Sequence, residues 1–363
     1  MPKNILEEIS TPLLTWYDAS HRNLPWRENK SVYRVWVSEI MLQQTRVEAV
    51  KPYFHRFMEA FPDITALAKA QDERLLKYWE GLGYYSRVKN MKKAAVIVVN
   101  EYEGILPNTY EQLIKLPGIG SYTAGAIASI AYNEPVPAVD GNVLRIISRL
   151  RMDEDDISLP GVKKKVEQEL LPVMPKDRPG DFNQAMMELG ATVCIPNGQA
   201  KCEECPWKNM CKAKKNKCIS LYPKKAAKKE RTIEYKTVLI IKDGEKVAIH
   251  KRASKGLLAG MYELPILEGN LKEKEVLKRL NNMGMRAIRI QALDNAKHIF
   301  SHKEWHMTGY AIRVDELSSN KDNESEMIFV HPKETEERYP IPAAFAAYVK
   351  YLNIKLGNDK FIS

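Results

Sequence analysis

Four cysteines lie within a short stretch of the chain, and they restrict its fold more than any other feature. Cys194, Cys202, Cys205 and Cys211 are separated by seven, two and five residues, and Cys218 follows after six more. Thiolates this close together can hold a zinc ion or an iron–sulfur cluster. A loop so short has little apolar core of its own, so we expect a metal to hold it together. The spacing alone does not choose between the two.

The chain is long enough for two domains with cores, with 363 residues of which 44% are hydrophobic. Its 56 Lys and Arg against 46 Asp and Glu give a net charge of +10. Most of this excess lies between Lys201 and Arg231, where eleven basic residues stand against three acidic ones. Such local charge suits a polyanion partner such as a nucleic acid, or a solvated linker. Charge by itself favours neither.

The sequence predicts a cytoplasmic protein. Residues 1–8 lack the apolar core of a signal peptide. The most apolar stretch, 122–132, is too short and too rich in small residues to span a bilayer. In a reducing compartment the cysteines are expected to be metal ligands or buried thiols rather than disulfides.

The pattern of apolar residues changes near residue 219, which predicts an all-α domain followed by a smaller α+β domain. The first domain covers 1–218 and includes the cysteine loop (194–211); its predicted helices are 35–50, 72–79, 88–102, 123–131, 143–150 and 182–193. Residues 219–234 are basic and are expected to be a linker. The second domain covers 235–355, with strands at 235–241, 246–250 and 306–314, a helix at 274–283, and a tail at 356–363.

A glycine-rich turn joins two predicted helices at residues 116–124. Gly118 and Gly120 allow a tight turn and close approach of a partner, and the helix starting near Ser121 offers free N–H groups to an anion such as a DNA phosphate. An ordinary turn between helices is the plain alternative. Dinucleotide binding is excluded, because residues 110–115 do not look like a strand and a third glycine is missing.

One carboxylate stands in an apolar helical segment. Glu39 has five apolar residues among its six nearest neighbours in the sequence. Desolvation would raise its pKa toward neutrality and make it a plausible general acid. A glutamate on the solvent face of the helix is the commoner case for an isolated residue.

These motifs resemble those of the endonuclease III and MutY superfamily. The cysteine loop is similar to its iron–sulfur loop, which usually has six residues in the first gap where this chain has seven. Cys218 could in principle replace Cys194, but we favour Cys194 because Cys218 begins the linker. The turn at 116–124 resembles the helix-hairpin-helix motif, and Asp140, 18 residues after Tyr122, matches the family's essential aspartate. The resemblance implies a 4Fe-4S cluster and DNA binding.

Residues 24–27, 36–45 and 79–87 resemble the MutY signature, and the likeness covers about residues 10 to 215. It implies that Glu39 protonates adenine and that Asp140 stabilises the sugar cation, with Tyr122 and Asn142 orienting Asp140 and a water. Strand-cleaving relatives carry a lysine where this chain has Tyr122. A phenol cannot form a Schiff base, so we expect base removal with little or no strand cleavage.

The same resemblance predicts the residues that contact the substrate. Those expected to line an adenine pocket are Arg22, Leu24, Trp26 and Gln184. Those expected to touch or wedge the DNA are Arg27, Gln44, Thr45, Leu82, Tyr84, Gly118, Gly120 and Ser121. Core packing is the alternative for Trp26 and Tyr84.

Residues 235 to about 355 resemble the Nudix-like C-terminal domain of the MutY family. Where a catalytic Nudix box needs glutamates for Mg²⁺, this chain has Asn281 and Asn282, and Leu277 replaces an arginine, so hydrolase activity is not expected. Phe300, Ser301 and His302 match the loop that recognises 8-oxoguanine, whose N7 is a donor where guanine has an acceptor. A metal site of His298, His302 and His306 is less favoured, because the segment does not look helical.

The predicted function is removal of adenine opposite 8-oxoguanine or G in double-stranded DNA, by a monomer that does not bind membranes. Two alternatives remain: a mismatch thymine or oxidised-pyrimidine glycosylase of the same superfamily, or a damage-binding iron–sulfur protein without catalysis. Glu39, Gln184 and the second domain argue against the first, and the pair Glu39 and Asp140 against the second.

Overall fold

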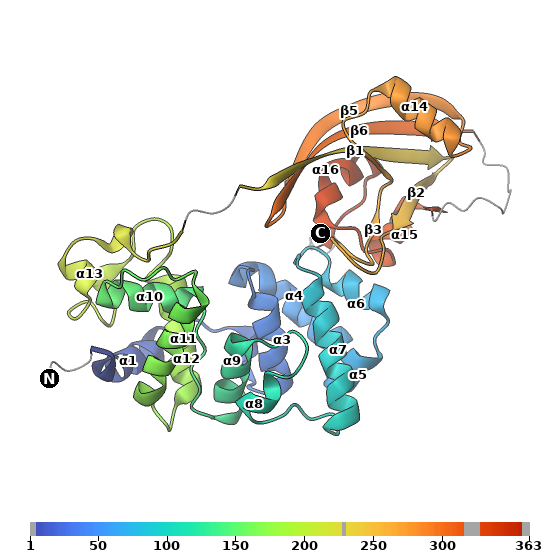
Figure 1. Cartoon of the computed structure of the whole chain (residues 1–363). Helices are drawn as coiled ribbons and strands as arrows, with labels where there is room; N and C mark the ends of the chain where they lie inside the picture. The colour runs from blue at the N-terminus through green and yellow to red at the C-terminus, as the bar shows by residue number, and fades with distance from the viewer. Residues whose placement is uncertain (1–4, 227–229, 316–326, 358–363) are drawn as a thin grey trace. The chain divides into compact units, whose positions relative to one another are not determined.

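The computed structural model of the chain describes residues 5–226, 230–315 and 327–357. Residues 227–229 of the predicted linker and 358–363 of the predicted tail lie outside this range. The chain divides into two compact units, one made of Met1–Lys69 and Asn90–Lys228 and the other of Ala70–Lys89 and Lys229–Ser363 (Figure 1). In the part of the chain that is described, no helix is both long enough and apolar enough to cross a membrane.

The first unit is built from helices, as predicted. Its helices are α1 (Ser10–Ser20), α2 (Pro25–Glu28), α3 (Val32–Leu42), α4 (Val47–Ala60), α5 (Ile64–Lys69), α8 (Tyr110–Leu113), α9 (Ser121–Tyr132), α10 (Gly141–Arg151), α11 (Pro160–Leu170), α12 (Pro179–Thr192) and α13 (Lys212–Lys215). Helix α7 (Ser86–Glu101) begins in the second unit and ends in the first. Helix α12 packs against α1, α9 and α10, and α3 packs against α4 and α9.

One hydrophobic core of this unit lies between α1, α10 and α12. It contains Leu13, Ile147, Phe182 and Leu189, and the cysteine loop contributes Trp207. The indole Nε1 of Trp207 donates to the carbonyl of Ile9 at 3.1 Å, so this buried ring also has its polar group satisfied. The cysteine loop is therefore held against the helices by the packing and the hydrogen bond of Trp207, in addition to its covalent connection to α12.

The predicted single helix at 35–50 is wrong, because the chain turns between α3 and α4. Gln44 has φ 56°, a left-handed conformation that a helix cannot continue through. Helix α4 begins at Val47. Apolar residues recur on both sides of the turn, and neither Gly nor Pro marks it, so no local signal predicts the break. The predicted helix at 72–79 coincides with α6 (Asp72–Trp79).

The described residues of the second unit form a seven-stranded sheet, which confirms the predicted α+β class. Its strands are β1 (Thr232–Asp243), β2 (Lys246–Lys251), β3 (Tyr262–Glu263), β4 (Ile266–Glu268), β5 (Ala287–Ile299), β6 (Lys303–Val314) and β7 (Met327–Val330). The order is β3-β2-β1-β6-β5, with β4 paired to β1 and β7 to β2. Strands β1 and β6 are parallel, in register from Thr232↔Lys303 to Lys242↔Arg313, and the other pairs are antiparallel.

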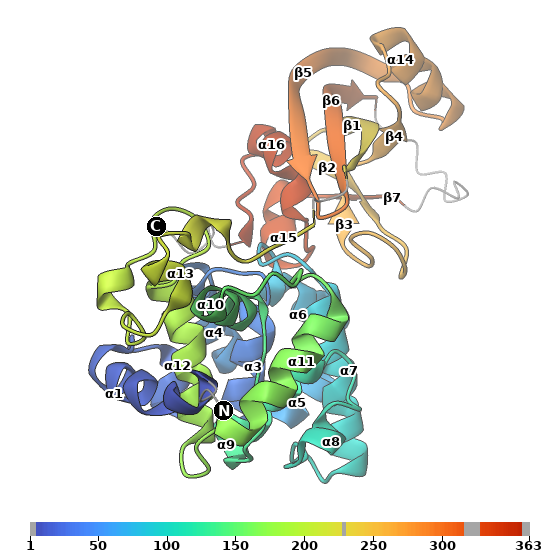
Figure 2. The ribbon, with the colours of Figure 1, turned by 60° about the vertical axis from the view of Figure 1, so that its left-hand side comes forward.

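Strand β1 is buried on both faces. Val238 and Ile240 belong to one core, which includes residues of α16 (Ala346–Val349), and Leu239 and Ile241 to another, which includes residues of α14 (Glu273–Asn282). Figure 2 shows α14 and α16 on opposite faces of the sheet. Two covered faces explain why this strand is a continuous apolar run rather than an alternating one.

Helix α6 and the turn after it belong to this second unit. The carboxylate of Glu80 is 1% exposed and accepts hydrogen bonds from the backbone N–H groups of Ile341, at 2.8 Å, and Gly357, at 3.1 Å. Lys77 lies 3.0 Å from the same carboxylate and donates to the carbonyl of Tyr339. These contacts join two segments that are far apart in the sequence.

Candidate active site and DNA-binding residues

Glu39 lies on α3, a helix that is buried over most of its length. The side chain is 5% exposed, and the Tyr122 hydroxyl donates to its Oε2 at 2.8 Å. Burial raises the pKa of Glu39 to about 7; the charge of Asp140 adds to the rise, while the Tyr122 hydrogen bond and the charge of Arg27 oppose it. A carboxyl with such a pKa holds its proton in a large share of molecules at neutral pH, which is what a general acid requires.

Tyr122 is the second residue of α9, so the helix that follows the glycine turn delivers it to Glu39. Desolvation, together with the charges of Glu39 and Asp140, raises its pKa well above 10. The phenol therefore keeps its proton and acts as a donor. It also lies 3.4 Å from the sulfur of Met187 on α12. The hydrogen bond of Tyr122 thus goes to Glu39, where the sequence predicted a role in orienting Asp140.

Asp140 is the N-cap residue of α10. Its Oδ1 accepts from the backbone N–H groups of Asn142, at 2.8 Å, and Val143, at 2.9 Å, and its Oδ2 accepts from Nδ2 of Asn142 at 2.7 Å. Arg145 in turn donates to Asn142 Oδ1, at 2.9 Å, and to the carbonyl of Cys194, at 3.0 Å. A helix N-terminus favours an anion, so the carboxylate is held in place as a fixed negative charge.

The glycine turn has the tight geometry that its sequence predicts. Gly118 has φ +80°, and a Cβ there would lie 2.8 Å from Cβ of Asn90. Gly120 is the N-cap of α9, and a Cβ there would meet no atom within 4 Å. Lys163 donates to the Ser121 hydroxyl at 2.8 Å. The first turn of α9 therefore carries a positive end with a lysine beside it, an arrangement that suits an anion.

Leu24, Trp26 and Gln184, predicted to line the adenine pocket, are all buried in this structure. Trp26 packs edge-to-face on Phe54, with ring centroids 5.5 Å apart, so it also has the core-packing role that was the alternative. Arg22 is partly exposed and is bound to Glu188 on α12. Gln184 and Glu188 lie four residues apart on α12 and therefore share one face of this helix, which brings Gln184 close to the Arg22–Glu188 pair.

The predicted wedge residues lie on two tight turns, one after α3 and one after α6. Gln44 has φ 56° and Tyr84 has φ 46°, both unusual for residues with a side chain. Thr45 hydrogen-bonds back to the carbonyl of Gln43, and Leu82 is buried. Tyr84 is 46% exposed, a high value for an aromatic residue. Its hydroxyl lies 3.0 Å from that of Ser301, which is in the same compact unit.

Phe300, Ser301 and His302 form the turn between β5 and β6. Phe300 packs between His298 and Trp305, with ring centroids at 4.6 and 4.9 Å, while Ser301 and His302 are exposed. Burial lowers the pKa of His298, which favours its neutral form. His306 instead packs on Tyr235. The two histidines therefore serve in separate aromatic contacts.

The thiols of Cys194, Cys202, Cys205 and Cys211 line one small cavity. Arg149 donates to Cys194 Sγ at 3.3 Å. In the described residues no group of three or more Cys, His, Asp or Glu side chains is arranged to share a single metal ion. Four thiols around one cavity are a donor set that fits either a zinc ion or an iron–sulfur cluster.

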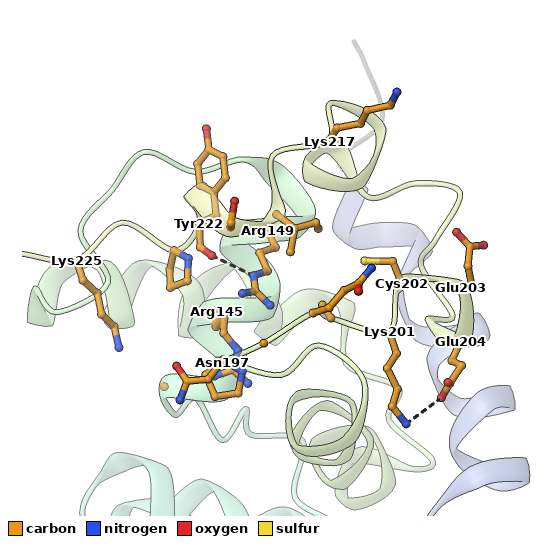
Figure 3. A pocket seen from close by; sticks show the side chains of 18 residues that line it. Arg145, Arg149, Asn197, Lys201, Cys202, Glu203, Glu204, Lys217, Tyr222 and Lys225 are labelled. Carbon is orange, nitrogen blue, oxygen red and sulfur yellow. Dashed lines mark hydrogen bonds and ion pairs between the residues drawn. The ribbon is translucent and has the colours of Figure 1, made fainter.

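Cys218 is not among the residues that line this cavity, and its Sγ lies 3.9 Å from the sulfur of Met152. An open pocket of about 1060 Å³ lies beside the loop (Figure 3). Lys201 and Lys225 line it, together with Arg149, which donates to the carbonyl of Tyr222 at 3.0 Å. Part of the charge excess seen in the sequence is therefore gathered on this side of the loop.

Sequence reasoning missed one functional candidate, Glu188. It is 1% exposed and binds both Arg22 and Arg27. Like Glu39, Glu188 stands in an apolar helical segment, Ala185 to Leu189, and this pattern is the sequence signal that predicts a buried carboxylate.

The comparisons with known proteins place the chain among base-excision DNA repair proteins. Residues 37–176 match the HhH-GPD superfamily of base excision DNA repair proteins, and residues 237–351 match the NUDIX domain. The structure of a thermostable thymine-DNA glycosylase is similar, with a TM-score of 0.54 and 26% identity over 58% of this chain and 97% of that chain. Endonuclease III bound to DNA shares the fold, with a TM-score of 0.51 and 22% identity.

Sequence relatives narrow the class further. The adenine DNA glycosylase of Mus musculus is 35% identical over 85% of this chain and 71% of its own length. That of Buchnera aphidicola subsp. Acyrthosiphon pisum is 36% identical over 88% of this chain and 89% of its own. The chain belongs to the adenine DNA glycosylase (MutY) family. Its activity is therefore removal of adenine from DNA in base excision repair.

Proposed function

We propose that the enzyme removes adenine that stands opposite 8-oxoguanine or G, and that it hydrolyses the N-glycosidic bond without cutting the strand. The observation that carries this proposal is Glu39, a buried carboxyl with a pKa raised to about 7 and fixed by Tyr122. Adenine leaves poorly as an anion, so an acid that protonates it lowers the barrier to departure.

The adenine must first be turned out of the stack, which costs a few kcal/mol and less at a mispair. Glu39 then gives its proton to N7, and the glycosidic bond breaks to leave an oxocarbenium-like sugar. The carboxylate of Asp140 stabilises this cation at no cost in reorganisation, because Asn142 and the N-terminus of α10 already hold it. A water then adds to the sugar and gives one proton to the carboxylate that Glu39 has become, as in glycosidases that use two carboxyl groups.

Tyr122 supports the assignment of a hydrolase without strand cleavage. A lyase needs an amine to form a Schiff base with the opened sugar, whereas this position holds a phenol engaged with Glu39. Borohydride treatment of the reacting enzyme and DNA is expected to trap little covalent adduct. Trapping in high yield would contradict the proposal.

Recognition of 8-oxoguanine is assigned to Ser301 and His302, which are exposed on the β5–β6 turn. The serine hydroxyl can accept from the N7–H that oxidation creates. Tyr84 shares a hydrogen bond with Ser301. The turn after α6 and the β5–β6 turn are therefore adjacent within one unit. Asn281 and Asn282 on α14 cannot supply the carboxylates of a Mg²⁺ site, which supports recognition rather than Nudix hydrolysis.

The cysteine cavity is proposed to hold a 4Fe-4S cluster through Cys194, Cys202, Cys205 and Cys211. When bound, the cluster would supply four bonds that staple the loop to the helical core. Visible absorption and about four iron atoms per chain are the expected results. A colourless protein containing zinc would contradict this assignment.

The deciding assay uses duplexes with A opposite 8-oxoguanine, A opposite G and T opposite G. Release of adenine from the first two supports the proposal, and preferential release of thymine supports the mismatch thymine alternative. Glu39→Gln is the matched control because it keeps the shape of the side chain and removes the acid.

The domain limits at 1–218, 219–234 and 235–355, a monomeric state and a cytoplasmic location remain predictions.

A further inference from the structure

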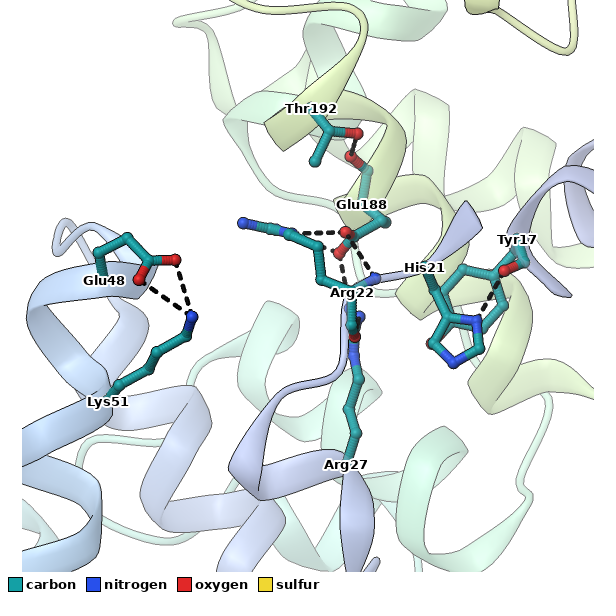
Figure 4. A network of polar contacts seen from close by, with 8 residues as sticks. All are labelled: Tyr17, His21, Arg22, Arg27, Glu48, Lys51, Glu188 and Thr192. Atoms are coloured by element: carbon teal, nitrogen blue, oxygen red, sulfur yellow. Dashed lines mark hydrogen bonds and ion pairs between the residues drawn. The ribbon is translucent and has the colours of Figure 1, made fainter. Parts of the chain in front are cut away.

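Glu188 is a buried carboxylate on α12 that binds two arginines at once (Figure 4). Its Oε1 accepts from Nε of Arg22 at 2.6 Å and from the backbone N–H of the same residue at 3.3 Å. Its Oε2 accepts from Nη2 of Arg22 at 3.1 Å and from Nη2 of Arg27 at 2.9 Å. One side chain, 1% exposed, thus collects four donors.

These donors come from two places in one short segment: Arg22 lies in the link between α1 and α2, and Arg27 lies in α2. Arg27 also donates from Nη1 to the carbonyl of Arg22 at 2.9 Å, which closes the segment on itself. Between the two arginines lie Leu24 and Trp26, both buried. A bidentate Arg–carboxylate contact fixes direction as well as distance. Glu188 therefore sets where this segment lies on α12, one turn from Gln184.

The charges of this group are unequal. Burial alone would raise the pKa of Glu188, but the hydrogen bond from Arg22 and the charges of Arg27 and Arg22 keep it below its ordinary value. Two guanidinium groups against one carboxylate leave one positive charge in excess. Arg27 is the more buried of the two, with 13% of its side chain exposed, and its guanidinium lies 5.6 Å from the ring of Tyr17.

We propose that Glu188 is a positioning residue for adenine excision: through Arg22 and Arg27 it holds the pocket wall that carries Leu24 and Trp26, and it offsets the positive charge of Arg27 near the acid. The proposal rests on the proposed function, since it takes that wall to be part of the adenine pocket. It assigns to Glu188 no contact with the substrate.

The electrostatic part acts on Glu39. Three charged or titratable groups act on this acid: Tyr122 from α9, Asp140 at the start of α10 and Arg27 from α2. Glu188 on α12 binds Arg27. The charge of Arg27 favours ionised Glu39 and so lowers its pKa. Without the carboxylate of Glu188, the charge of Arg27 acts more strongly on Glu39. The pKa of Glu39 then falls, and less of the acid is protonated at neutral pH.

The test compares Glu188→Gln with wild type in single-turnover adenine excision across pH 5 to 9. The rate falls as Glu39 loses its proton, so a lower pKa of Glu39 moves the fall to lower pH. The expected results are a rate at pH 7.5 reduced about tenfold or more and a midpoint lowered by roughly half a unit. Glu188→Asp keeps the charge and is expected to retain the wild-type midpoint with a partly reduced rate.

Exposed Glu59 on α4 provides the matched control, since Glu59→Gln removes one carboxylate from the same unit without touching the arginines. The proposal would be overturned if Glu188→Gln had a rate within about twofold of wild type and a pH midpoint within about 0.1 unit of it. A lower rate with the wild-type midpoint would also overturn it, because folding alone would explain that result. If wild type released another base, the proposed function would fail, while the same comparison on that base would still test Glu188.

Discussion

Glu39 illustrates how one buried group connects stability to chemistry. Desolvation that makes the carboxyl a usable acid also makes its ionised form costly to keep in the folded chain. The Tyr122 hydrogen bond recovers part of this cost and sets the direction of the carboxyl. An acid poised near neutrality is therefore a site where activity is gained at the expense of stability.

Replacing Glu39 by Gln is expected to reduce excision about 10²-fold or more, because the proton donor is lost. The same change is expected to stabilise the fold. The pKa of Glu39 rises from 4.5 to about 7 on folding, so wild type is most favoured below pH 4.5 and loses up to about 3 kcal/mol as pH rises to 7. In urea unfolding, the free energy of unfolding of the variant should exceed that of wild type by a margin that grows from pH 4.5 to pH 7 and stays constant above pH 7. The same difference in free energy of unfolding at pH 4.5 and at pH 8 would contradict the raised pKa of Glu39.

Asp140 has two roles that substitutions can separate. As N-cap of α10 it accepts two backbone hydrogen bonds, and asparagine caps a helix about as well as aspartate. We expect Asp140→Asn to keep the melting temperature near wild type and lose excision, and Asp140→Ala to lose both, with about 1 kcal/mol of destabilisation. Thermal unfolding and single-turnover rates measure the two effects. Full excision by Asp140→Asn would show that the charge is not needed.

Among the larger elements, the end of α6 shows how a local helix becomes part of a distant unit. Its sequence predicts only an amphipathic helix over residues 72–79. The structure adds the contacts of Glu80 with Ile341 and Gly357, which hold the turn carrying Leu82 and Tyr84 against the C-terminal segment of the second unit. Both residues proposed to touch DNA on this turn depend on that support.

Glu80→Ala is expected to destabilise the second unit by about 3 kcal/mol, because two buried N–H groups lose their acceptor and Lys77 loses its ion pair while keeping its hydrogen bond to Tyr339. Glu73 is the control: it pairs with Lys251 at the surface, and Glu73→Ala should cost less than about 1 kcal/mol. Urea unfolding of the full chain measures both. Equal effects of the two substitutions would show that burial of Glu80 does not matter.

For the molecule as a whole, charge sets how DNA binding responds to salt. The excess of basic residues between Lys201 and Arg231, part of it around the pocket beside the cysteine loop, can displace counterions from phosphates. Replacing Lys201 and Lys225 by Gln is expected to reduce the slope of log Kd against log salt by about 2, with little change in base preference. Fluorescence anisotropy at several salt concentrations measures it. An unchanged slope would place these lysines outside the interface.

The sequence by itself determined the two fold classes, the cysteine loop, the glycine hairpin, helix α6 and the strand β1. Each of these depends on residues that are neighbours in the chain: a helical or strand period, glycines that allow a turn, or thiols at metal-binding spacing. Signature segments such as 36–45 and 79–87 pointed to the family for the same reason, and the comparisons confirmed it.

Only the tertiary structure decided which groups meet. The turn at Gln44, the hydrogen bond of Tyr122 to Glu39 and the grouping of Ala70–Lys89 with the C-terminal unit have no local signal. Arg22 and Glu188, 166 residues apart, form their ion pair because α12 packs beside α1. Burial and hydrogen-bond partners, and with them the pKa of a buried acid, are properties of packing between distant segments, so they become definite only when the chain has folded.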